Sequence, residues 1–379
     1  MRHDLTADAA TQPGTTPWIT GTVRPAAWLI ATLTALIVLA GCGTRPGPET
    51  LLPVANLPDT RANLTVLTAT NRALSSIDPP LYGNERGAMS YEEYGLRVAP
   101  PAAGGSAASG LIAPDIKVVK RSRFGRSTFM EKVRQSQRAH DGSVILFVHG
   151  YNNTYQEAIF RLAGIAAESG VNAVPVVFSW PSAASVTGYV ADRDSSTFAR
   201  DDLAALLADL TASNPDTNVM VVGHSMGSWL VMETLRELRL TGRGDVIARL
   251  EVGLASPDID LDVFRKQAQD IGPMTPPLTV LAAPDDHALA ASARVAGGKA
   301  RLGAIHVNDP QMQALARQAG VRLIDISALP ASGRANHDRF LALATLRTPG
   351  TEDNPLQELR NTGAYVLGSA GRILAYGVR

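Results

Sequence analysis

The stretch Val219–Leu235, VMVVGHSMGSWLVMETL, decides the fold class. Four apolar residues, Val219–Val222, run directly into Gly-His-Ser-Met-Gly, and a segment of helical composition follows. This order is typical of a buried strand, a tight turn and a helix. Ser225 stands in the turn between Gly223 and Gly227. It is either an ordinary turn residue or a catalytic nucleophile, and the rest of the chain has to distinguish the two.

Strand-like and helix-like segments alternate on both sides of this turn. Strands are predicted for the apolar runs 144–150, 172–180, 218–223, 248–256, 278–284 and 321–327. Helices are predicted for 153–170, 198–213 and 226–240. Strands that are apolar on both faces and alternate with helices indicate an α/β fold, a mostly parallel central sheet with helices on both faces.

Composition narrows the classes of function. The chain has 379 residues, 45% hydrophobic and 18% charged, which is enough apolar material for a sizeable core. Lys and Arg number 35, as do Asp and Glu, so no basic excess indicates a nucleic-acid partner. Cys42 is the single cysteine, which excludes a disulfide within the chain. The zinc patterns H-E-x-x-H and H-x-x-E-H are absent, and no metal or organic cofactor is expected.

The N-terminal segment has the features of a secretory signal. An apolar run, Ala26–Ala40, follows Arg24 and is about as long as a signal-peptide core. The stretch Leu39–Cys42, LAGC, resembles the lipobox of bacterial lipoproteins, in which the signal is cleaved before the cysteine and the thiol carries a lipid. The resemblance implies that residues 1–41 are removed and that Cys42 anchors the protein to a membrane of the cell envelope. A plain N-terminal membrane anchor is the alternative.

The remaining chain divides by composition. Residues 42–60, rich in Pro, Gly and Thr, are predicted to form a tether. Residues 61–379 are predicted to form one domain, with N-terminal strands in 61–128 and a core in 143–345. The basic stretch 117–126 indicates a solvated strand edge or loop, or a contact with anionic lipid headgroups. For the tail 351–379 we expect a packing helix.

The surroundings of Ser225 favour the nucleophile. A serine hydroxyl reacts only with a base within hydrogen-bond reach and a third group that orients the base. A strand–turn–helix elbow holds the serine in a strained conformation, and small residues two positions to either side allow the strand and helix to pack closely. Gly223 and Gly227 meet this requirement.

The chain resembles the α/β-hydrolases, and more narrowly the bacterial esterase/lipase-like hydrolases of unassigned specific function. The resemblance covers about residues 63–340 and rests on an ordered series of motifs: ATNR, FVHGYNNTYQEA, FSWPS, GHSMGSWL, LASPDIDLDVF, DDHALAAS, RLG, IDIS and NHDRF. It implies a Ser-His-Asp triad in the chain order serine, acid, histidine.

His337 is the candidate base. It follows the last predicted strand, in the polar loop PASGRANHDRF, whereas the alternative His306 precedes that strand. His224 adjoins the serine, and we expect its side chain to point away from the hydroxyl.

The acid is chosen among four aspartates. The family pattern has an acidic residue two positions before Ala-Leu, which selects Asp286. Asp285 is adjacent to it, and Asp258 or Asp260 after the preceding strand are the remaining alternatives. An acidic residue at such a position is often only a helix cap.

The architecture also implies two donors for the oxyanion of the reaction intermediate. One is the backbone N–H of Met226, which follows the nucleophile. Resemblance to the His-Gly-X arrangement indicates that the second is the N–H of Tyr151, in HGYNN, with Asn152 as a possible third.

These features together predict a lipid-anchored serine hydrolase that acts on a small-molecule or lipid ester. A non-catalytic binding or assembly module on the same fold is the alternative from another class, and an amidase, thioesterase or peptidase is the alternative among hydrolases. The segment 182–202 lies between a strand and a helix, where it could cover the site. Oligomeric state leaves no signature in the sequence.

Overall fold

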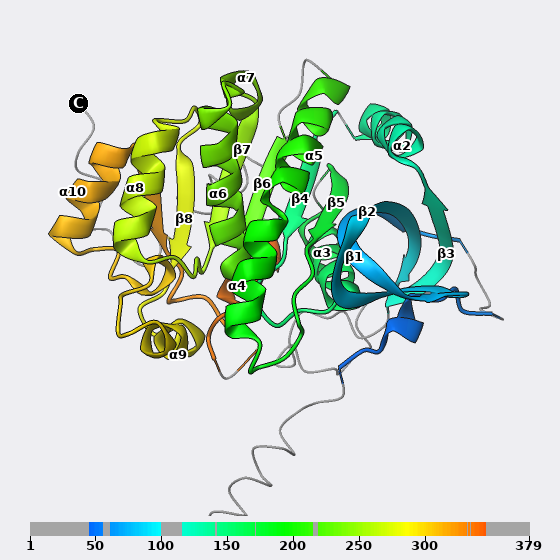
Figure 1. The fold of residues 1–379 in the computed structure, drawn as a ribbon, viewed down its shortest axis with the longest axis horizontal. Helices are drawn as coiled ribbons and strands as arrows, with labels where there is room; N and C mark the ends of the chain where they lie inside the picture. The colour runs from blue at the N-terminus through cyan, green and yellow to red at the C-terminus, as the bar shows by residue number, and fades with distance from the viewer. Residues whose placement is uncertain are drawn as a thin grey trace, which may run out of the picture. The chain divides into compact units, whose positions relative to one another are not determined.

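The computed structural model describes residues 45–55, 61–99, 116–140, 142–170, 172–214, 219–331, 333 and 335–345 (Figure 1). The predicted signal peptide, Cys42 and the tail 351–379 lie outside these residues. Among the helices described, none combines the length and the apolar composition that a membrane crossing needs.

A single sheet organises the described residues. Its nine strands lie in the order β3-β2-β1-β5-β4-β6-β7-β8-β9. From β1 through β5 to β9 all neighbours are parallel, while β2 pairs antiparallel with β1 and β3. The strands are β1 (Leu64–Ile77), β2 (Pro80–Val98), β3 (Ile116–Phe124), β4 (Val144–Val148), β5 (Val174–Ser179), β6 (Val219–His224), β7 (Leu250–Ala255), β8 (Leu278–Ala282) and β9 (Val321–Asp325). The predicted mostly parallel α/β fold is confirmed.

Helices cover both faces of the sheet. Figure 1 shows α5, α6 and α8 side by side in front of the strands, with α3 behind them. The α-helices are α2 (Arg126–Ala139), α3 (Tyr155–Ser169), α4 (Tyr189–Phe198), α5 (Arg200–Ser213), α6 (Met226–Leu240), α7 (Gly244–Ile247), α8 (Leu261–Ile271), α9 (His287–Val295) and α10 (Pro310–Ala319). Short 3-10 helices are η1 (Pro48–Leu51), η2 (Leu302–Ala304) and η3 (Arg339–Thr345).

Two apolar clusters fill the space between the sheet and its helices, one on each face. Within β4, Leu146 packs in the cluster that includes α5, α6 and α8, whereas Phe147 packs in the cluster that includes α3 and η3. Both side chains are almost fully buried. Alternate residues of the strand therefore face opposite cores, which is why the strand reads as a continuous apolar run.

Helix α3, which follows the loop at the end of β4, has strong end signals. Thr154 is its N-cap: the side chain accepts from the N–H of Glu157, and the Glu157 carboxylate accepts from the N–H of Thr154 at 2.8 Å. This reciprocal pair is a capping box, worth about 1 kcal/mol for the cap alone. Gly170 ends the helix with φ at 62°.

Three segments differ from the sequence-based predictions. Helix α2 lies in a segment for which no helix was predicted, because its buried stripe is narrow in a polar segment. Part of the predicted tether packs on the domain: Leu51 of η1 is buried, and the N–H of Val54 donates to the carbonyl of Val118. The predicted helix 198–213 is preceded by a separate helix, α4.

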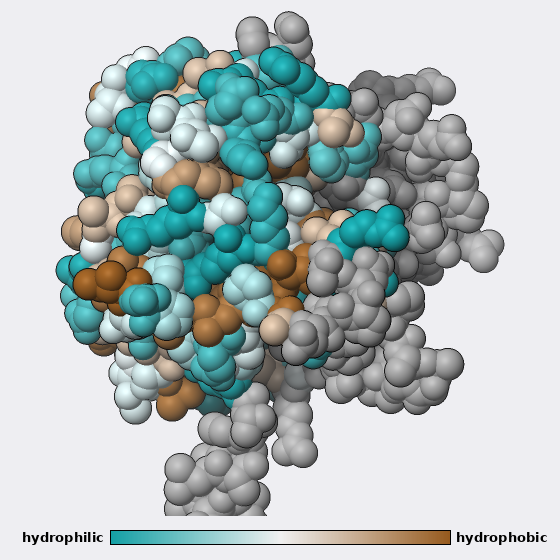
Figure 2. Space-filling model, turned by 90° about the vertical axis from the view of Figure 1, so that its right-hand side faces the viewer, coloured by the Kyte–Doolittle hydropathy of each residue, from teal (hydrophilic) through white to brown (hydrophobic). Residues whose placement is uncertain are grey.

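Strand β3 lies at one edge of the sheet and carries the basic stretch. Its side of the molecule is mostly hydrophilic, and hydrophobic residues occur there as separate spots (Figure 2). Several of the cations have acidic partners: Lys120 pairs with Glu93, and Arg126 pairs with Asp209. The stretch therefore forms a strand edge, one of the two structures expected for it.

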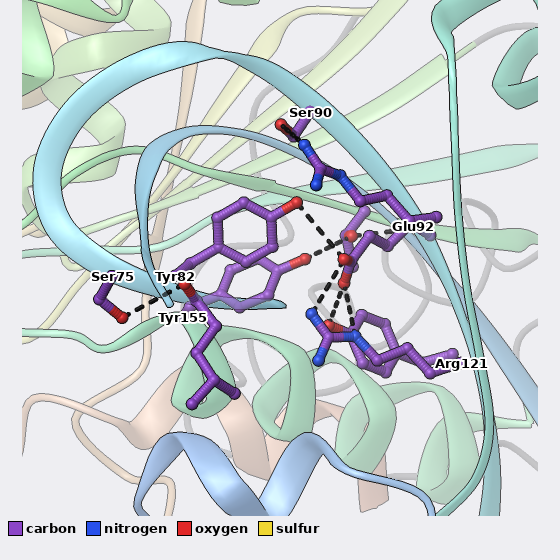
Figure 3. Close-up of polar contacts among 10 residues, drawn as sticks. Ser75, Tyr82, Ser90, Glu92, Arg121 and Tyr155 are labelled. Atoms are coloured by element: carbon purple, nitrogen blue, oxygen red, sulfur yellow. Dashed lines mark hydrogen bonds and ion pairs between the residues drawn. The ribbon is translucent and has the colours of Figure 1, made fainter. Parts of the chain in front are cut away.

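A buried polar cluster joins this edge to α3 (Figure 3). The Glu92 carboxylate is fully buried and accepts two hydrogen bonds from Arg121, at 2.9 and 3.0 Å. The hydroxyls of Tyr82 and Tyr94 also donate to Glu92. Burial and the neighbouring Glu92 charge raise the pKa of Tyr82 to about 12. Tyr155 packs edge-on against Tyr82, so the cluster links the antiparallel strands to the first turn of α3.

Candidate active site

Ser225 lies at the tight turn between β6 and α6. Its backbone has φ at 55° and ψ at −122°, a conformation that costs a residue with a side chain about 1–3 kcal/mol. Neighbouring backbone groups hold it there. The N–H of Ser225 donates to the carbonyl of Ala255 at 2.9 Å, and its carbonyl accepts from the N–H groups of Ser228 and Asp258 at 3.0 and 3.2 Å.

The glycines of the elbow permit close backbone contacts, as predicted. A Cβ on Gly227 would overlap the carbonyl oxygen of His149, at the end of β4. A Cβ on Gly223 would lie 2.9 Å from the Cα of Ser228. Any side chain at Gly227 would push the first turn of α6 away from the strand that adjoins it.

The structure brings together the predicted acid and base. Nδ1 of His337 lies 2.7 Å from Oδ2 of Asp286. The Asp286 side chain is fully buried, whereas that of His337 is 19% exposed. Asp286 also caps α9, because its Oδ1 accepts from the N–H of Leu289 at 3.0 Å. The cap and the histidine thus use different oxygens, so a capping role does not compete with an orienting role.

Asp286 binds Nδ1, so Nε2 is the ring nitrogen of His337 that can take a proton from Ser225. Among the described residues, no hydrogen bond joins the Ser225 hydroxyl to His337. Contacts of this kind are often long before a substrate is bound.

The alternative acids have other partners. Asp285 forms a bidentate ion pair with Arg339, at 2.5 and 2.7 Å, and this hydrogen-bonded guanidinium lowers the pKa of Asp285. Asp258 is buried against Arg301, with Nε at 3.2 Å from Oδ1. Asp260 caps α8 by accepting from two backbone N–H groups.

His224 contacts His337 rather than serving as a base itself. Its Nε2 lies 3.2 Å from the backbone carbonyl of His337 and must donate to it, and the two rings are 4.8 Å apart. Phe340 packs on the ring at 4.7 Å. Burial, followed by the neighbouring His337, holds the pKa of His224 well below its ordinary value, so the ring is neutral. The alternative base, His306, is exposed in the turn before α10.

The predicted oxyanion donors lie on the two segments that flank the nucleophile. Met226 is the first residue of α6, so its N–H has no acceptor within the helix. Tyr151 lies in the loop of residues 149–153, which we name the oxyanion loop after its predicted role. Its hydroxyl donates to the carbonyl of Val186 at 2.5 Å. Asn152 does not fit the additional donor role, because its N–H donates to Asp192 at 3.0 Å.

Sequence reasoning missed a buried arginine behind the oxyanion loop. Arg72, from β1, is fully enclosed, and burial lowers its pKa to about 10. Its Nη2 donates to the carbonyl of Asn153 at 2.8 Å and its Nη1 to the carbonyl of Ser182 at 3.1 Å. A signal was present in ATNR, which extends the β-prone run of residues 64–68 and includes an arginine.

Arg72 also helps to keep the ring of His149 neutral. Arg72 Nε donates to the Ser179 hydroxyl at 3.0 Å, and this hydroxyl lies 3.1 Å from Nε2 of His149. Nε2 also lies 3.1 Å from the carbonyl of Trp180, and Nδ1 lies 2.9 Å from the carbonyl of Gly150. Burial and the Arg72 charge lower the pKa of His149 to about 3, so the ring is neutral.

The described residues include no group of three or more His, Cys, Asp or Glu side chains that could hold a metal ion. The site offers a serine hydroxyl on a strained turn, an imidazole paired with a buried carboxylate, and backbone N–H groups on both sides of the serine. This set of groups is suited to acyl transfer through a covalent intermediate.

Comparisons with known proteins agree with the fold. The sequence pattern of a family described as "Alpha/beta hydrolase of unknown function" matches residues 125–351, more than half of the chain. An uncharacterised protein of Nostoc sp. (strain PCC 7120) is 40% identical over 63 residues, which are 17% of this chain and 16% of the relative. That match thus spans about a sixth of the relative's length. Among solved structures, the RedJ thioesterase of the prodiginine pathway of Streptomyces coelicolor shares 16% identity, with a TM-score of 0.30. The match covers 54% of this chain and 89% of the thioesterase chain, and the likeness is too weak to bear on activity.

Proposed function

The chain belongs to this α/β-hydrolase family of unknown function, and we propose that it is a serine hydrolase that cleaves carboxylic esters through a Ser225-His337-Asp286 triad. Ser225 attacks the acyl carbon while His337 accepts its proton. Asp286 orients the imidazole and stabilises its charged form. The N–H groups of Met226 and Tyr151 stabilise the oxyanion, each worth on the order of 3 kcal/mol of barrier height.

The ring of His337 then returns the proton to the leaving alkoxide, and water hydrolyses the acyl-enzyme by the same route in reverse. No cofactor is needed for either half of this reaction. Thioesters and amides would follow the same steps, with a better and a poorer leaving group respectively.

The observation that carries the proposal is the 2.7 Å contact between His337 and a fully buried Asp286. A binding module on this fold has no need to hold a partly exposed imidazole against a buried carboxylate. It also has no need for a serine at φ 55°, a conformation that glycine would adopt at lower cost. Together these two costly features support an enzyme over a non-catalytic module.

The first experiment is covalent labelling with a fluorophosphonate probe, which reacts with activated serines. We expect the wild-type protein to be labelled and Ser225→Ala to remain unlabelled. Ser228→Ala is a matched control, since Ser228 is a buried serine three residues away whose hydroxyl donates to the carbonyl of Gly223. A folded wild-type protein that resists labelling would contradict the catalytic proposal and favour the binding module.

The substrate class follows from a matched series. An ester, a thioester and an amide with the same acyl group test the leaving-group preference. Of these three substrates, we expect the ester to be hydrolysed with the highest kcat/KM. If only the amide or the thioester is turned over, the esterase proposal is wrong while the triad proposal stands.

We further propose that Cys42 carries a lipid and that the protein faces the periplasm or cell exterior. The LAGC stretch supports this placement. Cells grown with an alkyne fatty acid should incorporate the label into the wild-type protein and not into Cys42→Ala. Equal labelling of both proteins, or labelling of neither, would contradict lipidation at this residue.

A further inference from the structure

One buried carboxylate beside the candidate site takes no part in the proposed chemistry. Asp192, on α4, has no exposed surface. Its Oδ2 accepts from the N–H of Asn152 at 3.0 Å and from the hydroxyl of Ser182 at 2.6 Å, and its Oδ1 accepts from the N–H of Ala183 at 2.5 Å. These donors lie in the loops that follow β4 and β5. A single side chain of α4 therefore ties together two loops that meet beside the nucleophile.

The contact with Asn152 fixes an unfavourable backbone conformation. Asn152 has φ at 56°, in the left-handed region that residues with a side chain rarely adopt, although Asn tolerates it better than most. The next N–H, that of Asn153, donates to the Ser182 hydroxyl at 3.2 Å. Asp192 thus holds one N–H directly and the following one through Ser182. Both follow Tyr151, the predicted oxyanion donor.

The other side of Tyr151 is also held. Nδ1 of His149 lies 2.9 Å from the carbonyl of Gly150, and this carbonyl shares a planar peptide unit with the N–H of Tyr151. The direction of the Tyr151 N–H is consequently restrained upstream by His149 and downstream by Asp192.

Arg72 supplies the opposite charge on the same loops. It donates to the carbonyls of Asn153 and Ser182. Asp192 accepts from the N–H groups of Asn152 and Ala183 and from the Ser182 hydroxyl. Burying a carboxylate is costly unless it is hydrogen-bonded and compensated, and both conditions are met here.

Helix α4 reaches the opposite side of the nucleophile as well. The hydroxyl of Tyr189 donates to Oδ2 of Asp258 at 2.9 Å, and the N–H of Asp258 donates to the carbonyl of Ser225 at 3.2 Å. Asp192 therefore stands on an element that contacts both the oxyanion loop and the residue that supports the serine.

We propose that Asp192 is a positioning residue for acyl transfer: it holds the oxyanion loop in the conformation that directs the Tyr151 N–H at the oxyanion formed from the substrate. The proposal rests on the serine hydrolase function proposed above. It assigns to the segment 182–202 a part in building the site, beyond the covering role expected from its position.

The test compares Asp192→Asn with Asp194→Asn. The amide in Asp192→Asn would present one oxygen to donors that now use two, so an N–H of Asn152 or Ala183 would lose its acceptor. Asp194 lies on the same helix and is exposed. We expect Asp192→Asn to lower kcat for a p-nitrophenyl ester and the rate of fluorophosphonate labelling by about 10- to 100-fold, with KM within about twofold. Asp194→Asn should match the wild type.

A second readout separates positioning from general weakening of the fold. A trifluoromethyl ketone forms a tetrahedral adduct with the serine, so its inhibition constant should rise by a factor similar to the fall in kcat. A folded Asp192→Asn protein that labels and hydrolyses at the wild-type rate would overturn the proposal. If this variant does not fold, Ser182→Ala removes the hydroxyl that links Asp192 to the N–H of Asn153, along with the acceptor of the Ala184 N–H. A wild-type kcat in that protein would overturn the proposal. Failure of the wild type itself to label would instead contradict the proposed function.

Discussion

Asp285 and Asp286 are adjacent in the chain, but their carboxylates hold two different residues of one loop. Asp286 binds the ring of His337, and Asp285 forms an ion pair with Arg339 two residues further on. The N–H of His287 also donates to the carbonyl of Ala335. The loop that carries the candidate base is therefore attached to the start of α9 at three consecutive residues, and only one of these attachments involves the imidazole.

The neighbouring carboxylates allow a matched comparison. Asp286→Asn should lower kcat by about 10³- to 10⁴-fold, because an amide at this position favours the wrong tautomer of His337 and cannot stabilise its charged form. Asp285→Asn should change kcat by less than about tenfold, since it weakens a partly exposed ion pair and one hydrogen bond from Asn336. Steady-state kinetics on an ester substrate measures both. Equal losses in the two variants would mean that the loop, and not the carboxylate at the imidazole, limits activity.

The ring of His224 and its hydrogen bond to the His337 carbonyl can be tested separately. His224→Phe keeps an aromatic ring beside His337 and Phe340 but removes the donor to the His337 carbonyl. Loss of one neutral hydrogen bond, about 1 kcal/mol, should lower kcat about fivefold without changing KM. Because the His224 ring is neutral, the acid limb of the pH–rate profile should have the slope of one proton in both proteins. A two-proton slope that becomes single in His224→Phe would show that His224 titrates in the working range.

Mild acid should destabilise the fold through the buried ring of His149. The pKa of His149 is about 3 in the folded protein, below the ordinary 6.5, so the unfolded chain binds a proton that the folded protein excludes. The free energy of unfolding should be fully retained above about pH 6.5 and should fall by up to about 1.4 kcal/mol per pH unit for this group as the pH decreases towards 3. His224 has a lowered pKa and adds a loss of the same sign.

Urea unfolding at pH 7 and pH 5 measures this loss. His149→Asn should reduce the difference between the two pH values, whereas substitution of the exposed His306 should leave it unchanged. An unfolding free energy that is equal at both pH values would contradict the assignment of neutral buried rings.

The Glu92–Arg121 pair should be essential to the sheet edge. Arg121→Met leaves a fully buried carboxylate without its cation, which typically costs about 3–5 kcal/mol. Arg126→Met is the control: its ion pair with Asp209 is largely exposed, and its loss should cost less than about 1 kcal/mol. Chemical unfolding compares the two variants. If Arg121→Met together with Glu92→Gln is as unstable as Arg121→Met alone, the unpaired charge is not the cause.

Much of this fold could be predicted because its central strands are apolar on both faces. The start of α6 at Met226 followed from local residue types alone. The choice between Asp285 and Asp286 did not follow from local residue types, because the two aspartates differ only in which way the backbone turns after β8. Helix α2 was missed because few of its residues face the core.

The charged residues behind the oxyanion loop were the least predictable. Arg72 and Asp192 are far apart in the chain, and each becomes interpretable only when β1 and α4 are placed beside the loop after β4. A charged residue in a sequence usually indicates a solvated surface. Burial of these two is a property of the assembled structure, and no local pattern around Asp192 distinguishes it from Asp194.

The position of β1 has a practical consequence for recombinant fragments. The family match begins at residue 125, after β1, β2 and β3, yet β1 pairs in parallel with β5 through Leu67 to Thr70 and supplies Arg72. A fragment that starts at residue 125 would leave β5 as an open edge next to apolar residues, which favours aggregation. It would also remove the guanidinium that supports the oxyanion loop from behind. The boundary of sequence similarity and the boundary of the cooperative folding unit are therefore different, and expression should begin before β1.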